Sequence, residues 1–194
     1  MTTPFLRFAL SLAWLVLATL PCSAAETRAG KKTTPLANPN AIVDVQHRVL
    51  AYSQLQEKIR AELPMKVTNS AAKLGEVEIE FARRVREARA GARPGDIFSP
   101  AAADEFRRLI AQAMSGPGAK RIRASLRRAE PVNLKLNVND PYPPNIPVQS
   151  TPPTLLRHLP LLPKGLDYRV VNRDLVLRDS AANLIVDFIP HAIP

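Results

Sequence analysis

Residues Leu166–Ile189 have the sequence LDYRVVNRDLVLRDSAANLIVDFI, the stretch of the chain that decides its fold class. Apolar side chains alternate along it on both sides of Asn172-Arg173, a pair that can form a turn. The alternating positions are Leu166, Tyr168, Val170, Leu175 and Leu177. A period of two residues is typical of a half-buried strand, so the pattern predicts a β-hairpin.

A third strand is predicted after a second turn at Asp179–Ala182. Residues Asn183–Ile189, NLIVDFI, are rich in β-branched side chains and include Phe188, and Pro190 follows them. These features favour a strand, although a helix over Ala181–Ile189 is the alternative. We therefore expect this part of the chain to form a small antiparallel sheet.

Upstream of the hairpin, the chain is rich in proline. Val132–Val138 alternates apolar side chains with asparagine and lysine, which predicts another half-buried strand. Asn139–Pro153 contains six prolines in 15 residues, so neither a helix nor a central strand can continue through it. Thr154–Leu159 has room for one helical turn.

Four helices are predicted before Glu130. The first two, Ala41–Leu63 and Ser70–Ala90, carry apolar residues at alternating steps of three and four, as on one face of a helix. Pro64 ends the first, and the short connection predicts an antiparallel helical hairpin. In that hairpin, we expect the stripe Leu74, Val77, Phe81 and Val85 to be buried against Val45, Val49 and Tyr52.

The third and fourth helices are shorter. Ser99-Pro100 supplies an N-cap and a proline at the first helical position, and Ser115–Gly118 ends the third helix. The fourth, Ala119–Ala129, is strongly basic, and Ile122 and Leu126 are its only large apolar residues. The predicted class is α+β: a helical hairpin plus two shorter helices, followed by a proline-rich segment and a small antiparallel sheet.

The N-terminus has the pattern of a secretory signal. Met1–Arg7 carries one arginine and no acid, and Phe8–Leu20 is a run of 13 apolar and small residues. Pro21 breaks this run, and the small residues of Cys22–Ala25 form a site that signal peptidase can cleave. Residues 1–25 are therefore predicted to be a signal peptide. The run is shorter than the roughly 20 residues that span a bilayer, which argues against a retained anchor.

Cleavage there removes Cys22, the only cysteine, and with it disulfide and thiolate chemistry. A lipid on Cys22 is the alternative, but Pro21 fits poorly before a lipidated cysteine. Residues 26–40 have few apolar side chains and are expected to form a flexible leader. The remainder divides into a basic helical region, 41–130, and a proline-rich segment with a C-terminal β-meander, 131–194, which are expected to share one core.

Positive charge gathers in the helical part of the chain. Glu26–Glu130 has a net charge of +8, whereas Pro131–Pro194 has +1. One arginine cluster lies at positions 83–89, where glutamates three and four residues away predict a mixed-charge surface. The other lies in the fourth helix, and its candidate anion-binding residues are Arg121, Arg123, Arg127 and Arg128. Cationic surfaces attract phosphate-bearing partners, although a merely solvated helix face is the alternative.

Catalytic chemistry has little support in the sequence. There is no GxGxxG, GxxxxGK[ST], GxSxG or HExxH motif. The histidines, His47, His158 and His191, are far apart, and three aspartates of the sheet region are first interpreted as turn residues. These aspartates are Asp174, Asp179 and Asp187. No catalytic, cofactor-binding or metal-binding residue is assigned.

Three functions stay open: an exported non-catalytic protein that makes contacts in the cell envelope, an anion-binding module for envelope lipid or polymer, and an enzyme with a scattered site. The expected location is periplasmic or extracellular. Export, the absence of a recognition signature and the lack of interleaved aromatic residues argue against nucleic acid as a partner. A cavity that gathers Asp174, Asp187 or His158 would favour the enzyme.

The C-terminal stretch Leu166–Pro194 resembles the ends of uncharacterised exported bacterial proteins. The resemblance is clearest over Arg173–Pro190, which contains RDLVLRD and ANLIVDFIP. It implies an exported bacterial protein, and it supplies neither an activity nor a site residue.

Overall fold

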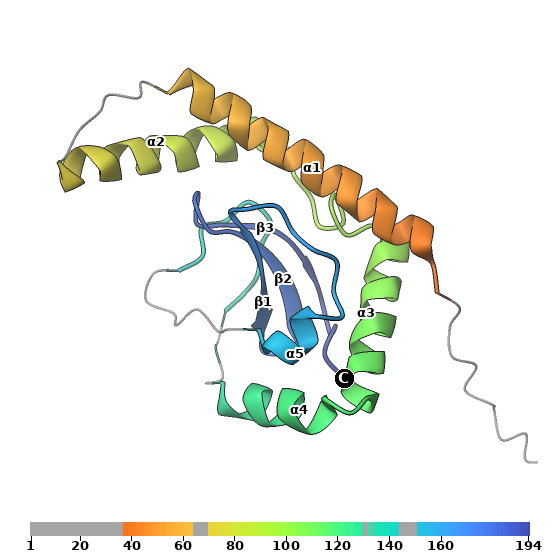
Figure 1. Ribbon diagram of the computed structural model, residues 1–194. Coiled ribbons are helices and arrows are strands. Elements are labelled where there is room, and N and C mark those ends of the chain that lie inside the picture. The colour runs from red at the N-terminus through yellow and green to blue at the C-terminus, as the bar shows by residue number, and fades with distance from the viewer. Residues whose placement is uncertain (1–36, 64–69, 130–131, 133, 144–150) are drawn as a thin grey trace, which may run out of the picture. The chain divides into compact units, whose positions relative to one another are not determined.

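The computed structural model describes residues 37–63, 70–129, 132, 134–143 and 151–194 (Figure 1). Along these residues, five helices are followed by three strands, which confirms the α+β class. Their bounds are Pro39–Glu62 (α1), Ala71–Ala88 (α2), Pro100–Ser115 (α3), Ala119–Arg128 (α4), Pro153–Leu156 (α5), Leu166–Val171 (β1), Asp174–Asp179 (β2) and Leu184–Ile189 (β3). The predicted signal peptide, 1–25, and residues 26–36 of the predicted leader lie outside the described residues.

Helix α1 begins two residues before its predicted start, because Asn38 caps it. The Asn38 side chain accepts a hydrogen bond from the Ala41 N–H (3.2 Å), and Pro39 occupies the first turn, where its missing N–H is not needed. Residues 39 and 40, assigned to the leader from sequence, are therefore helical. The Asn38 N–H also donates to Glu105 Oε2 (3.1 Å), which joins the start of α1 to α3.

Helices α1 and α2 contact each other through the C-terminal part of α2. Phe81 and Val85 are buried there, in one core cluster with Val45, Val49 and Tyr52 of α1. Leu74 was expected in the same stripe, but it is 51 % exposed because the first turns of α2 extend past this cluster. The predicted burial is thus confirmed for Phe81 and Val85 and is wrong for Leu74, and the α1 residue over the Phe81 ring is Arg60 in the last turn of that helix (4.0 Å to the ring centroid).

The three strands form an antiparallel sheet in the order β1-β2-β3. Asn172, at the first predicted turn, and Asn183, which was predicted to begin the third strand but ends the second turn, have positive φ angles of 56° and 50°. Asparagine tolerates this conformation better than most residues. One face of the sheet packs on the helices, and its side chains belong to the same core cluster as α1–α5. The alternative helix over 181–189 is wrong, because β3 occupies this stretch.

The opposite face of the sheet is covered by the segment that was predicted to be a strand over Val132–Val138. Its described residues are not a strand: Leu134 and Leu136 pack against a second small cluster on the sheet. This cluster consists of Tyr142, Val171, Val176 and Ile185.

Pairing with the sheet occurs later in this segment, where the Asn139 N–H donates to the Ile185 carbonyl (2.8 Å) and the Tyr142 N–H to the Asn183 carbonyl (2.8 Å). The ladder stays short, because Pro141 and Pro143 lack N–H donors.

Candidate functional site

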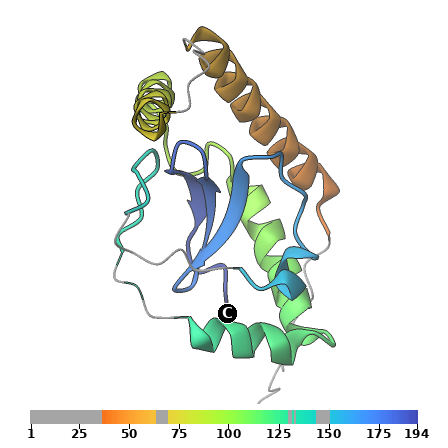
Figure 2. The same cartoon turned by 60° about the vertical axis from the view of Figure 1, so that its left-hand side comes forward.

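Helix α4 docks on the molecule through a narrow apolar edge. Ile122 is fully buried, Ala119 is buried, and Leu126 packs partly buried against the main core cluster. The helix contacts α3 and α5, beside which it lies in both views (Figures 1 and 2). Since this edge takes only one side of the helix, the lysine and all four arginines of α4 are exposed.

Four of these cations surround a small residue. Lys120, Arg121, Arg127 and Arg128 lie four and three residues before and after Ala124, so they are its neighbours on the helix surface. We call these four residues the basic patch. Lys120 and Arg127 are seven residues apart, as are Arg121 and Arg128, which is about 10 Å along the helix axis.

The basic patch has no acidic partner within the described part of the chain: none of the ion pairs there involves any of its four residues. Each of the four cations lies three or four residues from Ala124, so an anion placed over Ala124 would be close to all of them. The chemistry that the patch offers is therefore the binding of negatively charged groups.

Arg123 has a different task from the other predicted anion-binding residues. Its Nη2 donates a hydrogen bond to the carbonyl oxygen of Met114 (2.6 Å), in the last turn of α3. A cation near the carbonyl end of a helix also interacts favourably with the helix dipole. Arg123 therefore joins α4 to α3, and Lys120 takes its place among the cations that face outward.

Two members of the second arginine cluster, Arg83 and Arg84, are neutralised by glutamates of their own helix, α2. Arg83 pairs with Glu80 (2.6 Å) and Glu87, and Arg84 pairs with Glu80 (2.8 Å). Hydrogen bonds from Arg83 and then Arg84 lower the pKa of Glu80 to about 2. The predicted mixed-charge surface is confirmed here, and these arginines are occupied by internal partners.

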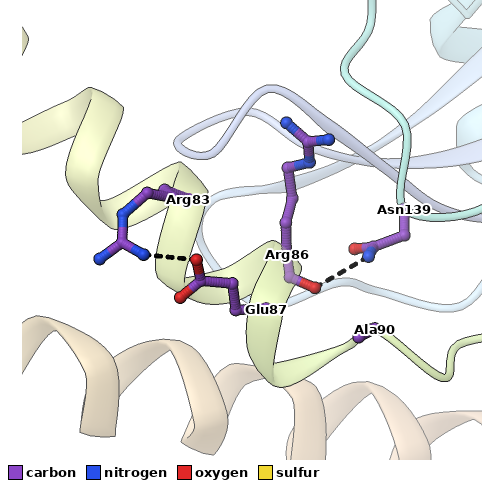
Figure 3. A pocket seen from close by; sticks show the side chains of 5 residues that line it. All are labelled: Arg83, Arg86, Glu87, Ala90 and Asn139. Carbon is purple, nitrogen blue, oxygen red and sulfur yellow. Dashed lines mark hydrogen bonds and ion pairs between the residues drawn. The ribbon is translucent and has the colours of Figure 1, made fainter.

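The end of α2 borders a cavity of about 340 Å³ lined by Arg83, Arg86, Glu87, Ala90 and Asn139 (Figure 3). Asn139 donates through Nδ2 to the carbonyl oxygens of Arg86 (2.9 Å) and Arg89 (3.1 Å), near the end of the helix. The Arg86 side chain extends away from the Arg83–Glu87 pair (Figure 3). Since the lining combines arginines with a carboxylate and the negative end of a helix, the cavity does not select for anions.

Two buried aspartates of the sheet hold the helices in place. Asp179 is fully buried; its Oδ1 accepts from the N–H groups of Ala181 (2.8 Å) and Ala182 (2.9 Å), as expected for a turn residue. Its Oδ2 accepts from the Tyr52 hydroxyl (2.6 Å) and from Gln56 Nε2 (2.5 Å), both on α1. Burial, and then the negative charge of Asp179, raises the pKa of Tyr52, so the hydroxyl stays protonated.

Asp187, also fully buried, serves the loop between α2 and α3. Its Oδ2 accepts from the N–H groups of Ile97 (2.9 Å) and Phe98 (2.8 Å), and Gly95 donates to the same carboxylate (3.1 Å). The alternating apolar pattern around this residue gave no signal for that role. Both buried carboxylates are thus occupied by structural hydrogen bonds.

The residues that would favour an enzyme are not brought together. Asp174 accepts from the His191 N–H (2.8 Å), and the His158 side chain is exposed. Neither the cavity at the end of α2 nor a larger one beside α5 is lined by Asp174, Asp187 or His158. Among the residues with described positions, no group of three His, Cys, Asp or Glu side chains could hold a metal ion.

A second cavity, of about 410 Å³, runs between β1 and the segment around α5. Its lining consists of Thr151, Leu156, Pro160, Leu161, Leu162, Leu166, Asp167, Tyr168 and Arg169. Leu161 on its rim is 91 % exposed, and Leu156 is 38 % exposed. Asp167 and Arg169 neutralise each other across 2.6 Å, so the cavity is mainly apolar. No sequence pattern predicted that Leu156 and Leu161 would be exposed here.

Comparison with known proteins finds no relative of this chain. No family model matches the chain, and neither a curated protein nor a solved structure matches it. Within the described residues, no helix has the length and the apolar character that crossing a membrane would require.

Proposed function

We propose that the chain is an exported, non-catalytic protein that acts by contact in the cell envelope, with the basic patch of α4 as its anion-binding surface. The signal-like residues 1–25 and the resemblance of Arg173–Pro190 to exported bacterial proteins support export. The partner is envelope material that carries many negative charges, either lipid or polymer.

A single observation carries the binding part of the proposal. The patch presents four cations around Ala124 without an acidic partner in the described part of the chain. On α2, by contrast, Arg83 and Arg84 are paired with glutamates, so their charge is already neutralised within the protein. Exposed cations near an anionic lipid surface contribute about 1 kcal/mol each, and four of them suffice for reversible attachment.

The test compares charge reversal on α4 with the same reversal on α2. Arg127→Glu/Arg128→Glu should weaken binding to anionic envelope fractions by about 30-fold or more, since at least two contacts are lost. Arg83→Glu/Arg84→Glu carries the same change in net charge and should weaken binding much less, because both arginines are already paired with glutamates. Binding of the unaltered protein should fall as salt is raised, because screening shortens to about 8 Å at 0.15 M. Equal losses in both variants would contradict a specific role for α4.

A further inference from the structure

One of the two exposed leucines, Leu156, belongs to a helix that lies against α4. Helix α5 contacts α4, and a Cβ placed on Gly118, just before α4, would lie 3.8 Å from the Thr154 Cβ of α5. Leu156 is the last residue of α5, and it lines the same cavity as Leu161. Figure 2 shows α5 above α4, with the chain then running up to β1.

Leu161 is held outward by its own surroundings. Pro160 and Pro163 flank Leu161-Leu162 and restrict the backbone, so this short segment cannot easily fold back to cover the side chain. Single exposed leucines are common on protein surfaces. Here, however, Leu161 is 91 % exposed on the rim of an apolar cavity to which Leu156 also contributes.

Cations lie on both sides of Leu161 in the chain. Arg157 follows α5 and Lys164 precedes β1; both side chains are exposed, and neither takes part in an ion pair among the described residues. Asp167, the acid of the cavity, is already paired with Arg169. The apolar rim is therefore bordered by positive charge, the combination found on surfaces that rest in the headgroup region of an anionic bilayer.

We propose that the partner of the basic patch is a phospholipid bilayer, and that Leu161, with Leu156 beside it, enters the apolar region of that bilayer. This inference rests on the proposed function and names its partner. A charged polymer would use the cations of α4 and leave the leucines in water. A bilayer uses both, because phosphate groups meet the cations while the leucine side chains leave water.

The first experiment measures binding of the mature chain, residues 26–194, to vesicles with anionic phospholipid, to neutral vesicles and to soluble polyphosphate, because the apolar run of the predicted signal peptide would bind vesicles by itself. Leu161→Ser should weaken binding to anionic vesicles by about tenfold or more, from the lost burial of one leucine, and leave polyphosphate binding unchanged. Ile79→Ser is the matched control, because Ile79 is 72 % exposed but lies on α2. It should bind all three ligands as the unaltered protein does.

A second measurement reports insertion directly. Trp14, the only tryptophan of the sequence, lies in the predicted signal peptide, so Leu161→Trp in the mature chain carries one fluorescent reporter on the cavity rim. Its emission should shift to shorter wavelength with anionic vesicles and should not shift with polyphosphate.

The outcomes separate this inference from the proposed function. If Leu161→Ser binds anionic vesicles as tightly as the unaltered protein, or if only polyphosphate is bound, the bilayer is not the partner. The proposed function stands in that case, provided Arg127→Glu/Arg128→Glu still weakens binding. If that double variant binds every anionic ligand normally, the basic patch itself is not the binding surface.

Discussion

Helices α2 and α4 are both rich in arginine, but they arrange their charge in opposite ways. In α2, glutamates occur three and four residues from the arginines, and Arg83 and Arg84 pair with them. In α4, the sequence AKRIRASLRR contains no acid, and the four cations of the basic patch surround Ala124. The comparison teaches that acidic residues three and four positions away, more than the number of arginines, decide which cations stay available to a partner.

The largest expected effect on the free energy of unfolding comes from a substitution on the buried side of α2. Phe81→Ala should lower the free energy of unfolding by about 3 kcal/mol or more, because Phe81 is only 1 % exposed in the core shared with α1. Leu74→Ala, on the exposed first turns of the same helix, should change it by about 0.5 kcal/mol or less. Urea denaturation measures both. Similar losses in the two variants would mean that α2 packs along its whole length.

The corresponding attachment of α4 is weaker and uses Arg123. Arg123→Ala removes the hydrogen bond to the Met114 carbonyl and should cost about 1 kcal/mol. Arg121→Ala, which breaks no such bond, serves as the control and should cost less. Chemical denaturation gives the stabilities. If Arg121→Ala is the more harmful change, the assignment of Arg123 as the connection between α3 and α4 is wrong.

The difference between the two helices can be removed by one substitution. Ala124→Glu places a carboxylate among the four cations of the basic patch, which should stabilise the protein by about 0.5–1 kcal/mol through pairs at three and four residues. The same variant should lose affinity for anionic vesicles. Ala124→Gln, of similar size but uncharged, should do neither. Tighter vesicle binding by Ala124→Glu would contradict the charge arrangement proposed for α4.

The smallest expected effect is a pH dependence of the protein's stability, which arises from Glu80 of α2. The pKa of Glu80 is lowered from 4.5 to about 2 in the folded chain, so its ion pairs stabilise the fold above pH 4.5. That contribution is lost as pH falls from 4.5 through about 2. The stability of Glu80→Gln should therefore approach that of the unaltered protein over this range. Denaturation curves at pH 6, 4 and 2 test the trend, and a constant difference would exclude it.

Local signals predicted most of the fold. Ser99-Pro100 and Ser115–Gly118 marked the ends of α3 correctly, because capping and turn residues act on their own neighbours. The strand expected at Val132–Val138 was wrong for a physical reason. Alternating apolar residues can satisfy their burial by packing on a sheet face, as Leu134 and Leu136 do, without backbone pairing.

The site was only partly predictable for a similar reason. The charge patterns of α2 and α4 follow from residues three and four apart, which the sequence displays directly. The bond from Arg123 to the Met114 carbonyl depends on the turn between α3 and α4, and the exposure of Leu161 depends on how α5 and β1 are placed. Such distant relationships leave no local signal.

The buried carboxylate of Asp187 has a consequence for the order in which the molecule can be built. During synthesis the helices leave the ribosome before β3, yet the loop before α3 is held by Asp187, and α1 is held by Asp179 at the end of β2. Until the sheet has been synthesised, the Tyr52 hydroxyl and the N–H groups of Ile97 and Phe98 therefore lack the carboxylates that accept their hydrogen bonds in the folded protein. Completion of the native structure must wait for the late strands, so a stalled chain would remain open to proteases and chaperones.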